Sequence, residues 1–244
     1  MGKIMLVTSG KGGTGKSTVA LNLGLSLARE GKKAIILELD SGLRCLDLML
    51  GIDDIVYDLG DVLSGNCEFS QAIYEAEGVE GLSIIAAPAK SDYVLSHNRF
   101  CTFCRHLCSV YDFIILDTPA GLGAELYAAA AASSFALVVT NLSPISVRDA
   151  EKAAFALKEA GLKKIRLVVN LVPLEVDDKN QLADLDDIID SVGAQLIAVV
   201  PEDRTLRKCV SERNKKEIKK SIGILSFENL AKRILGQDIP LLFK

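Results

Sequence analysis

A run of eight residues from Gly10 to Ser17 has the composition and spacing of a phosphate-binding loop. It reads Gly-Lys-Gly-Gly-Thr-Gly-Lys-Ser, which satisfies the pattern G-x-x-x-x-G-K-[ST] directly after a short apolar run. Glycines let backbone N–H groups point at phosphate oxygens, and the positive end of a helix starting near Ser17 adds its dipole. The loop therefore predicts binding of ATP with Mg²⁺.

The side chains of this loop have distinct expected roles. Lys16 is expected to bridge the β- and γ-phosphates, and the Ser17 hydroxyl is expected to bind Mg²⁺. A glycine-rich turn without a ligand would explain the glycines but neither of these two side chains. The predicted nucleotide-binding residues of the loop are Gly10, Gly12, Gly13, Thr14, Gly15, Lys16, Ser17 and Thr18.

Two acidic residues follow later apolar runs and complete the predicted site. Asp40 comes after the run 34–39, and Asp117 comes after the run 113–116. Asp40 is expected to orient water against the γ-phosphate and to lie near Mg²⁺, although it could instead only cap a turn. Asp117 is expected to hold Mg²⁺ through water. The predicted metal-binding residues are thus Ser17, Asp40 and Asp117.

These residues need a scaffold that brings strand ends together, and the rest of the chain predicts one. Short apolar runs rich in β-branched residues predict buried strands at 4–8, 34–39, 82–86, 113–116, 136–140, 165–170 and 196–200. Segments of helical length and pattern lie between them at 17–30, 99–110, 147–160 and 182–192. Strands that are apolar on both faces and alternate with helices indicate a doubly wound α/β fold, with a mostly parallel sheet and helices on both faces. Ligands are then expected at the carboxyl ends of the strands.

Size and charge limit the possible classes of protein. A chain of 244 residues, about half of them apolar, can form one domain spanning 1–244. The net charge of −4 argues against a surface devoted to neutralising phosphates. The apolar stretch 124–142 contains Glu125 and is mostly Ala and Ser, so a helix, a turn and a buried strand are expected rather than a membrane span. No export signal is recognised, and we expect a cytoplasmic protein.

Lys11 adds a second lysine to the loop, and here the sequence resembles a known family. The run from Gly10 to Thr18 is similar to the deviant Walker A motif of the MinD/ParA family of ATPases. In that family the extra lysine reaches across a nucleotide-sandwiched dimer to the phosphates of the partner. The resemblance therefore implies a homodimer in the ATP-bound state, with Lys11 joining Lys16 and Asp40 in catalysis. A solvated lysine on the loop is the simpler alternative.

The two switch segments of the family also have counterparts. Residues 38–47 resemble the first switch, Asp-x-Asp-x-Gly-Leu-Arg-Asn-Leu-Asp, with Glu38 in place of the first Asp and Cys45 in place of the Asn. Asp40 keeps the water-positioning place, so the resemblance implies that the chain is an ATP hydrolase. Residues 117–121, Asp-Thr-Pro-Ala-Gly, match the second switch.

The resemblance further assigns the base of the nucleotide to two strand ends. It places adenine contacts at Asn170 and in the loop formed by Pro201, Glu202 and Asp203. The residue type alone says only that an amide can pair with a purine edge.

The match runs from residue 1 to about residue 235 and favours the MinD branch of the family. It implies an ATP–Mg²⁺-dependent dimerisation switch in division-site placement, with a regulatory protein of the MinE or MinC kind as partner. Three alternatives are a partition ATPase that binds DNA, a regulator of flagellar number, and an iron–sulfur carrier on the same fold.

Cys101, Cys104 and Cys108, with His97 and His106 nearby, form the pattern that suggests a metal cluster. Because positions 101, 104 and 108 fall on one stripe of a helix, we expect buried free thiols packed on the sheet instead.

The last part of the chain carries a basic cluster and a short apolar tip. The cluster could contact DNA or an anionic membrane, or could be a solvated face, and consists of Arg204, Arg207, Lys208, Arg213, Lys215, Lys216, Lys219 and Lys220. Pro240 opposes a terminal helix of the kind that anchors members of the family, so only weak peripheral contact with the inner face of the cell membrane is expected.

Overall fold

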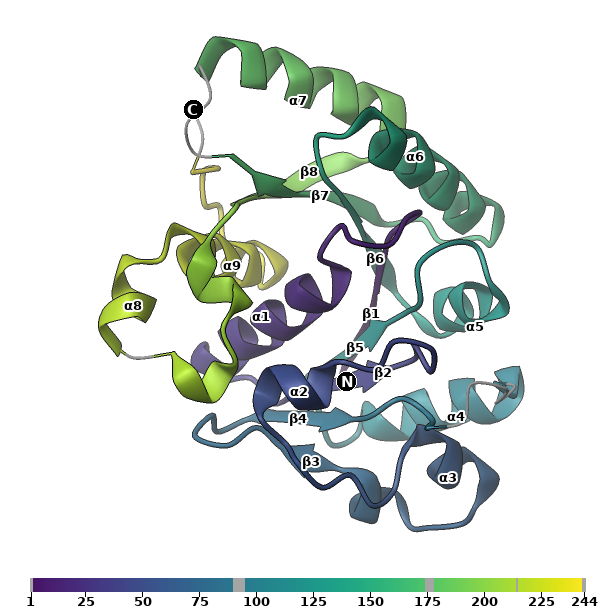
Figure 1. The fold of residues 1–244 in the computed structure, drawn as a ribbon. Helices are drawn as coiled ribbons and strands as arrows, with labels where there is room; N and C mark the ends of the chain where they lie inside the picture. Colours follow the sequence, from purple (N-terminus) through teal and green to yellow (C-terminus); the bar gives the residue numbers. More distant parts are fainter. Residues whose placement is uncertain (1, 90–94, 174–177, 214, 243–244) are drawn as a thin grey trace.

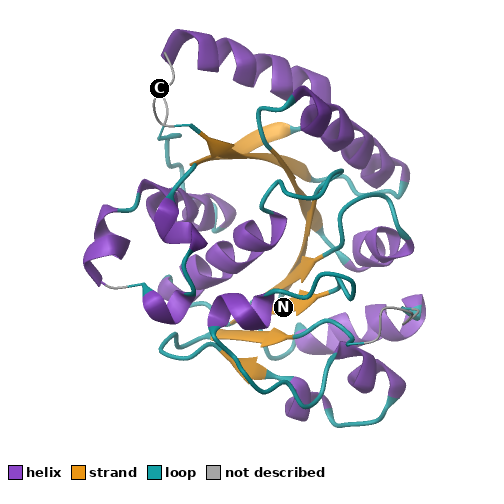
Figure 2. Ribbon diagram, in the orientation of Figure 1, coloured by secondary structure: helices purple, strands orange, loops and turns teal. Residues whose placement is uncertain are grey.

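The computed structural model describes residues 2–89, 95–173, 178–213 and 215–242, and its centre is one twisted sheet (Figure 2). The sheet has eight strands in the order β3-β4-β2-β5-β1-β6-β7-β8. The strands are β1 (Lys3–Thr8), β2 (Ala34–Glu38), β3 (Tyr74–Glu75), β4 (Leu82–Ile85), β5 (Phe113–Asp117), β6 (Phe135–Thr140), β7 (Ile165–Val172) and β8 (Gln195–Pro201). All neighbouring pairs are parallel except β3 and β4. This confirms the predicted doubly wound fold.

Each of the seven predicted strands coincides with an observed strand within one or two residues at either end. The strand that was not predicted is β3, which pairs with β4 through only two residues at the edge of the sheet. Its side chains are half-buried or exposed, so it has no apolar run to reveal it.

Helices cover both faces of the sheet. They are α1 (Lys16–Arg29), α2 (Leu46–Leu50), α3 (Leu59–Ser64), α4 (His97–Leu107), α5 (Ala124–Ala132), α6 (Pro144–Glu159), α7 (Asp178–Val192), α8 (Lys215–Lys220) and α9 (Ile222–Ile234), with short 3₁₀ turns η1 (Phe69–Ala72), η2 (Arg204–Arg207) and η3 (Val210–Glu212). The predicted helices correspond to α1, α4, α6 and α7. Figure 1 shows α1 and α9 on one side of the sheet and α4, α5 and α6 on the other.

Strand alternation explains why two separate cores form. Successive side chains of a strand point to opposite faces, so Met5 and Leu6 of β1 belong to different clusters. Met5 packs with residues of α1, α2 and α9, among them Phe227. Leu6 packs with residues of α4, α5, α6 and α7, among them Phe100. Both clusters contain side chains of the same strands. Packing on the two faces of the sheet therefore holds in place the strand ends that carry the predicted site.

Candidate nucleotide site

The register of three central strands places the predicted acids beside the phosphate loop. Asp117, the last residue of β5, is level with Val7 of β1 on one side and with Glu38 of β2 on the other. The phosphate loop follows β1 and the segment with Asp40 follows β2. All of these groups therefore meet at the carboxyl edge of the sheet, as the sequence predicted.

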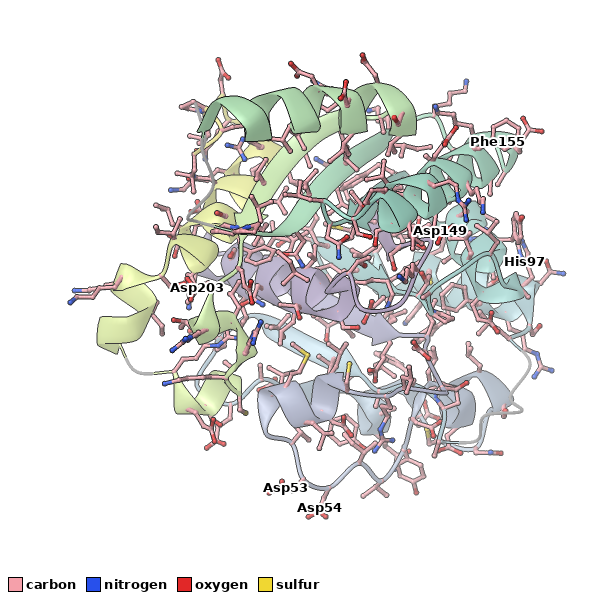
Figure 3. All side chains as sticks on the ribbon, turned by 45° about the horizontal axis from the view of Figure 1, so that its top comes forward. Asp53, Asp54, His97, Asp149, Phe155 and Asp203 are labelled. Carbon is pink, nitrogen blue, oxygen red and sulfur yellow. The ribbon has the colours of Figure 1, made fainter. Side chains whose placement is uncertain are left out.

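Two glycines of the loop occupy positions where a side chain would not fit. Gly15 has φ +82°, and a Cβ built on it would lie 2.2 Å from Nδ2 of Asn170. A Cβ on Gly10 would lie 2.0 Å from the backbone oxygen of Asp149, which Figure 3 labels on α6. The glycines thus allow both a left-handed turn and a close approach to α6 and β7.

A buried ion pair lies at the base of the loop. Nζ of Lys16 is 3.1 Å from Oδ1 of Asp117, whose side chain is completely buried. Burial raises the pKa of Asp117, while the Lys16 ammonium and the Ser17 hydroxyl lower it. Among the described residues, Oδ2 of Asp117 and Oγ1 of Thr14 are buried without a hydrogen-bond partner. Unpartnered oxygens at this depth suit a bound cation with its water ligands, so the donor set fits Mg²⁺ and a nucleotide phosphate.

A cavity of about 420 Å³ opens in front of the loop. Its described lining contains Ser9, Gly12, Gly13, Thr14, Gly15, Lys16, Ser17, Thr18, Asp40, Leu43, Arg44, Cys45, Met49 and Ala120. The structure thus brings most of the predicted phosphate and metal residues together around one space. Lys11 is exposed and lies outside this lining, as do Asn170, Pro201, Glu202 and Asp203.

Asp40 lies in a loop that Glu38 fixes at its far end. Oδ1 of Asp40 accepts a hydrogen bond from the Leu43 amide at 3.1 Å. Oε1 of Glu38 accepts from the amides of Cys45 and Leu46 at 2.7 and 3.1 Å, and Oε2 accepts from the Ala87 amide at 3.3 Å. Glu38 is completely buried, and burial raises its pKa while the three amides lower it.

Glu38, which replaces the first Asp of the family pattern, acts as an anchor in the structure. The carboxylate joins the end of β2, the start of α2 and the segment after β4. The sequence pattern does not predict this anchoring role, because the Ala87 amide comes from a part of the chain 49 residues away.

Cys45, the second departure from the family pattern, lies beside the predicted magnesium ligand. Burial raises the pKa of the Cys45 thiol to about 11, and a hydrogen bond with Ser17 opposes the rise. The thiol is therefore protonated at neutral pH and acts as a neutral lining group of the cavity.

The residues predicted to contact adenine are held by bonds within the protein. Nδ2 of Asn170 donates to the Thr14 carbonyl at 2.8 Å, which ties β7 to the phosphate loop. Asp203 accepts from the Thr205 amide at 2.8 Å, the Ser221 hydroxyl at 2.7 Å and the Gly223 amide at 3.1 Å. Their contact with a base remains a prediction.

Arg213 corrects part of the prediction for the basic cluster, because it is buried rather than solvated. Its guanidinium donates to Oδ1 of Asn22 at 2.7 Å and to the carbonyls of Leu206 and Lys208 at 3.3 and 3.2 Å. It therefore fastens the segment after β8 to α1. Nothing in the local sequence distinguishes it from its exposed basic neighbours.

Comparison with known proteins identifies this arrangement. The model of the CobQ/CobB/MinD/ParA nucleotide binding domain matches residues 5–216. The septum site-determining protein MinD of Synechocystis sp. is 37% identical over 249 aligned residues, covering 99% of this chain and 92% of the relative. The chain belongs to the MinD/ParA family.

Solved MinD structures have the same fold along nearly the whole chain. MinD of Pyrococcus horikoshii, complexed with Mg-ADP, superposes with a TM-score of 0.81 at 30% identity and 96% coverage of both chains. A chain of the MinC:MinD complex from Aquifex aeolicus superposes with a TM-score of 0.85 at 28% identity and 98% coverage of both chains. These matches favour the MinD branch over the partition, flagellar and iron–sulfur alternatives.

The cysteine pattern occupies the sheet-facing side of α4 in this MinD/ParA chain. Cys104 and Cys108 are buried in the core, and burial raises the pKa of both thiols, whereas Cys101 is only half-buried. His106 packs edge-on against Phe69 with ring centroids 5.3 Å apart. In the described parts of the chain, no three or more His, Cys, Asp or Glu side chains are grouped to hold a metal ion.

The remaining basic residues of the cluster differ in what surrounds them. Arg204 and Lys219 are exposed, and Arg207 pairs with Glu202 at the surface. The side chains of Lys215 and Lys216 lie outside the described residues.

Near the end of the chain, Arg233 donates to the carbonyls of Ile239 and Pro240. Over the described residues, no helix has both the length and the apolarity needed to cross a bilayer.

Proposed function

We propose that this chain is a MinD-like ATPase whose ATP-dependent dimerisation serves division-site placement. The observation that carries the proposal is the buried pair of Lys16 and Asp117 at the base of a glycine-rich cradle. The cradle supplies backbone donors for phosphates, and the pair supplies a cation for the phosphates and a carboxylate for Mg²⁺. The curated relative at 37% identity is a septum site-determining protein, which supports the cellular role.

The residues of the cradle would have different functions in binding and hydrolysis. Lys16 and the loop amides would bind the β- and γ-phosphates, and Ser17 and Asp117 would hold Mg²⁺. The metal would supply positive charge to offset the charge that develops on the phosphates during hydrolysis. Asp40 holds the attacking water, because it lines the cavity and its loop is fixed by Glu38. Asn170 and residues 201–203 enclose the adenine.

The exposed position of Lys11 supports a role outside its own site. Its side chain does not line the cavity of its own chain and is free to reach the phosphates bound by a second copy. We therefore expect residues 1–244 to act as one unit that dimerises when ATP is bound. A MinC- or MinE-like regulator would recognise the dimer, and the protein would act in the cytoplasm or at the inner face of the cell membrane.

The test measures molar mass by light scattering with ATP and Mg²⁺ for the unchanged chain, Lys11→Ala and Asp40→Ala. Asp40→Ala should accumulate as a dimer because hydrolysis is lost, and Lys11→Ala should stay monomeric. Lys33→Ala removes an exposed lysine at the opposite edge of the sheet and should behave like the unchanged chain. Nucleotide binding is measured in parallel by fluorescence titration. If all the proteins bind ATP and stay monomeric, the dimer mechanism is wrong.

A further inference from the structure

A second cavity lies at the opposite edge of the sheet from the phosphate loop. It has a volume of about 340 Å³, within the range of small-molecule pockets. It opens where β1, β6, β7 and β8 begin and where α9 ends. The six residues of β1 separate it from the phosphate loop by roughly 20 Å, so the two sites cannot share one small ligand.

The strands place their first polar side chains on a single face. Lys3 shares a face with Met5, which belongs to the core under α1 and α9. Arg166 lies between Ile165 and Leu167, which both point into the other core, so it also faces α9. Lys164 precedes β7 and lines the same cavity. Strands β1 and β7, which lie on either side of β6, thus bring these three cations to one end of one face.

Arg233 of α9 adds a fourth cation from the opposite wall. Its guanidinium donates to the carbonyls of Ile197, Ile239 and Pro240, all of which are uncharged acceptors. Burial lowers its pKa, as expected when no carboxylate offsets the lost hydration. Lys3 lies 5.9 Å from the centre of the Phe113 ring, and Arg166 donates to its neighbour's carbonyl.

Within the residue ranges that the structure describes, positive charge is therefore concentrated here without a neutralising group. Among the described residues, no Asp or Glu lines the cavity, and no ion pair is formed by any of its four cations. The chain as a whole has a net charge of −4, so this concentration is not a reflection of its average composition. Four cations around one small space repel one another, and a multivalent anion would relieve the repulsion.

The floor of the cavity is apolar. Phe135, Ile197 and Ile234 line it and pack against the core at their other sides. A free phosphate ion would fill only part of the space and would leave these surfaces in contact with water. An apolar body attached to the anion would cover them and gain free energy from their burial.

We propose that this cavity binds an organic phosphate, with the phosphate group held by Lys3, Lys164, Arg166 and Arg233 and its apolar body resting on Phe135. An arginine guanidinium can donate two parallel hydrogen bonds to the oxygens of a phosphate. The lysine ammonium groups add positive charge without requiring a particular direction of approach. The site is separate from the nucleotide site and does not depend on how that site works.

The test titrates 1-naphthyl phosphate into the full chain saturated with ADP and Mg²⁺, so that the phosphate loop is already filled. Calorimetry should show binding that weakens with added salt. Lys164→Gln and Arg166→Gln should each weaken it about tenfold or more, since each removes a charged hydrogen-bond donor. Lys163→Gln is the matched control, because Lys163 is an exposed lysine next to Lys164 that does not line the cavity. Inorganic phosphate should bind more weakly than 1-naphthyl phosphate.

A second arm distinguishes a soluble ligand from a lipid headgroup. Sedimentation with vesicles of phosphatidic acid in phosphatidylcholine presents the same phosphate monoester on a membrane. Binding to vesicles alone, weakened by Lys164→Gln and not by Lys163→Gln, would keep the proposal and identify the source as lipid. Absence of binding in both arms, or binding equal in Lys164→Gln and Lys163→Gln, would overturn it. Circular dichroism confirms that each variant is folded.

Discussion

Asp203 accepts three hydrogen bonds where the chain leaves β8, and its titration should affect the stability of the fold. Burial raises its pKa, but the bonds from Ser221, Thr205 and Gly223 outweigh this effect and hold the pKa below the ordinary value of 3.8. A depressed pKa means that the folded state favours the charged form. The stabilising contribution is therefore complete above pH 3.8 and disappears as the pH falls through the lowered value.

Asp203→Asn tests the direction of this dependence of stability on pH. The amide nitrogen of asparagine cannot accept the bonds from Ser221 and Gly223, so the variant should lose about 1–3 kcal/mol of unfolding free energy near neutral pH. The difference from the unchanged chain should shrink as the pH falls below about 4. Urea denaturation over this pH range measures it. The adjacent Glu202→Gln removes only a surface pair with Arg207 and should change little. A difference that does not vary with pH would contradict the assignment.

At the scale of residues, the sequence predicted what a short motif specifies and missed what distant segments supply. Lys16, Ser17 and Asp117 meet as expected, because the motif and the strand ends both constrain them. Glu38 and Arg213 gained their roles from amides and carbonyls that only the fold brings near. A single sequence contains no signal for such partners.

At the scale of elements, the contact between the phosphate loop and α6 depends on the absence of one side chain. A Cβ on Gly10 would lie 2.0 Å from the oxygen and 2.2 Å from the carbon of the Asp149 carbonyl, both backbone atoms. Gly10→Ala should therefore push the loop away from α6 and cost about 1–3 kcal/mol of unfolding free energy. Gly12→Ala is the control, since no atom lies within 4 Å of its Cβ position.

Both variants are compared with the unchanged chain by urea denaturation without nucleotide. Gly12→Ala should stay within about 0.5 kcal/mol of it, as surface substitutions usually do. Equal stability of Gly10→Ala and Gly12→Ala would mean that the loop yields to α6 without cost, contrary to the expected close packing.

The parallel strands were predictable because their burial is regular. The seven parallel strands show continuous apolar runs because helices cover both of their faces. The edge strand β3 lacks such a run, and helix α2, with five residues, is too short to show a helical repeat. Helix α2 begins where Glu38 accepts the amides of Cys45 and Leu46, so a tertiary contact rather than its own sequence defines its start.

At the scale of the whole molecule, nucleotide binding should add to stability because both cores are built on the strands that carry the site. A ligand at one hundred times its Kd stabilises the folded state by about 2.7 kcal/mol, which corresponds to a rise in Tm of roughly 5–10 °C for a chain of this size. Adding ADP with Mg²⁺ should produce such a rise, and chelation of the metal should reduce it. Differential scanning fluorimetry provides the measurement.

Lys16→Ala should lack this rise in Tm, because it removes the cation proposed to bind the phosphates, whereas Lys33→Ala should keep it. The unliganded Tm of each variant serves as its own reference. An equal rise in Lys16→Ala and the unchanged chain would place the bound nucleotide elsewhere. This measurement is independent of dimerisation, so it separates a failure to bind nucleotide from a failure to associate.

The hydrogen bond between Glu38 and the Cys45 amide closes the intervening segment into a small ring, since the two residues are seven positions apart. Asp40 belongs to this closed segment rather than to an open loop. A closed segment has fewer conformations than an open one, so less backbone entropy would be lost when Asp40 is held in the position that the proposed mechanism requires. The buried carboxylate of Glu38 thus restricts the segment that carries Asp40, which favours the water-orienting role proposed for Asp40.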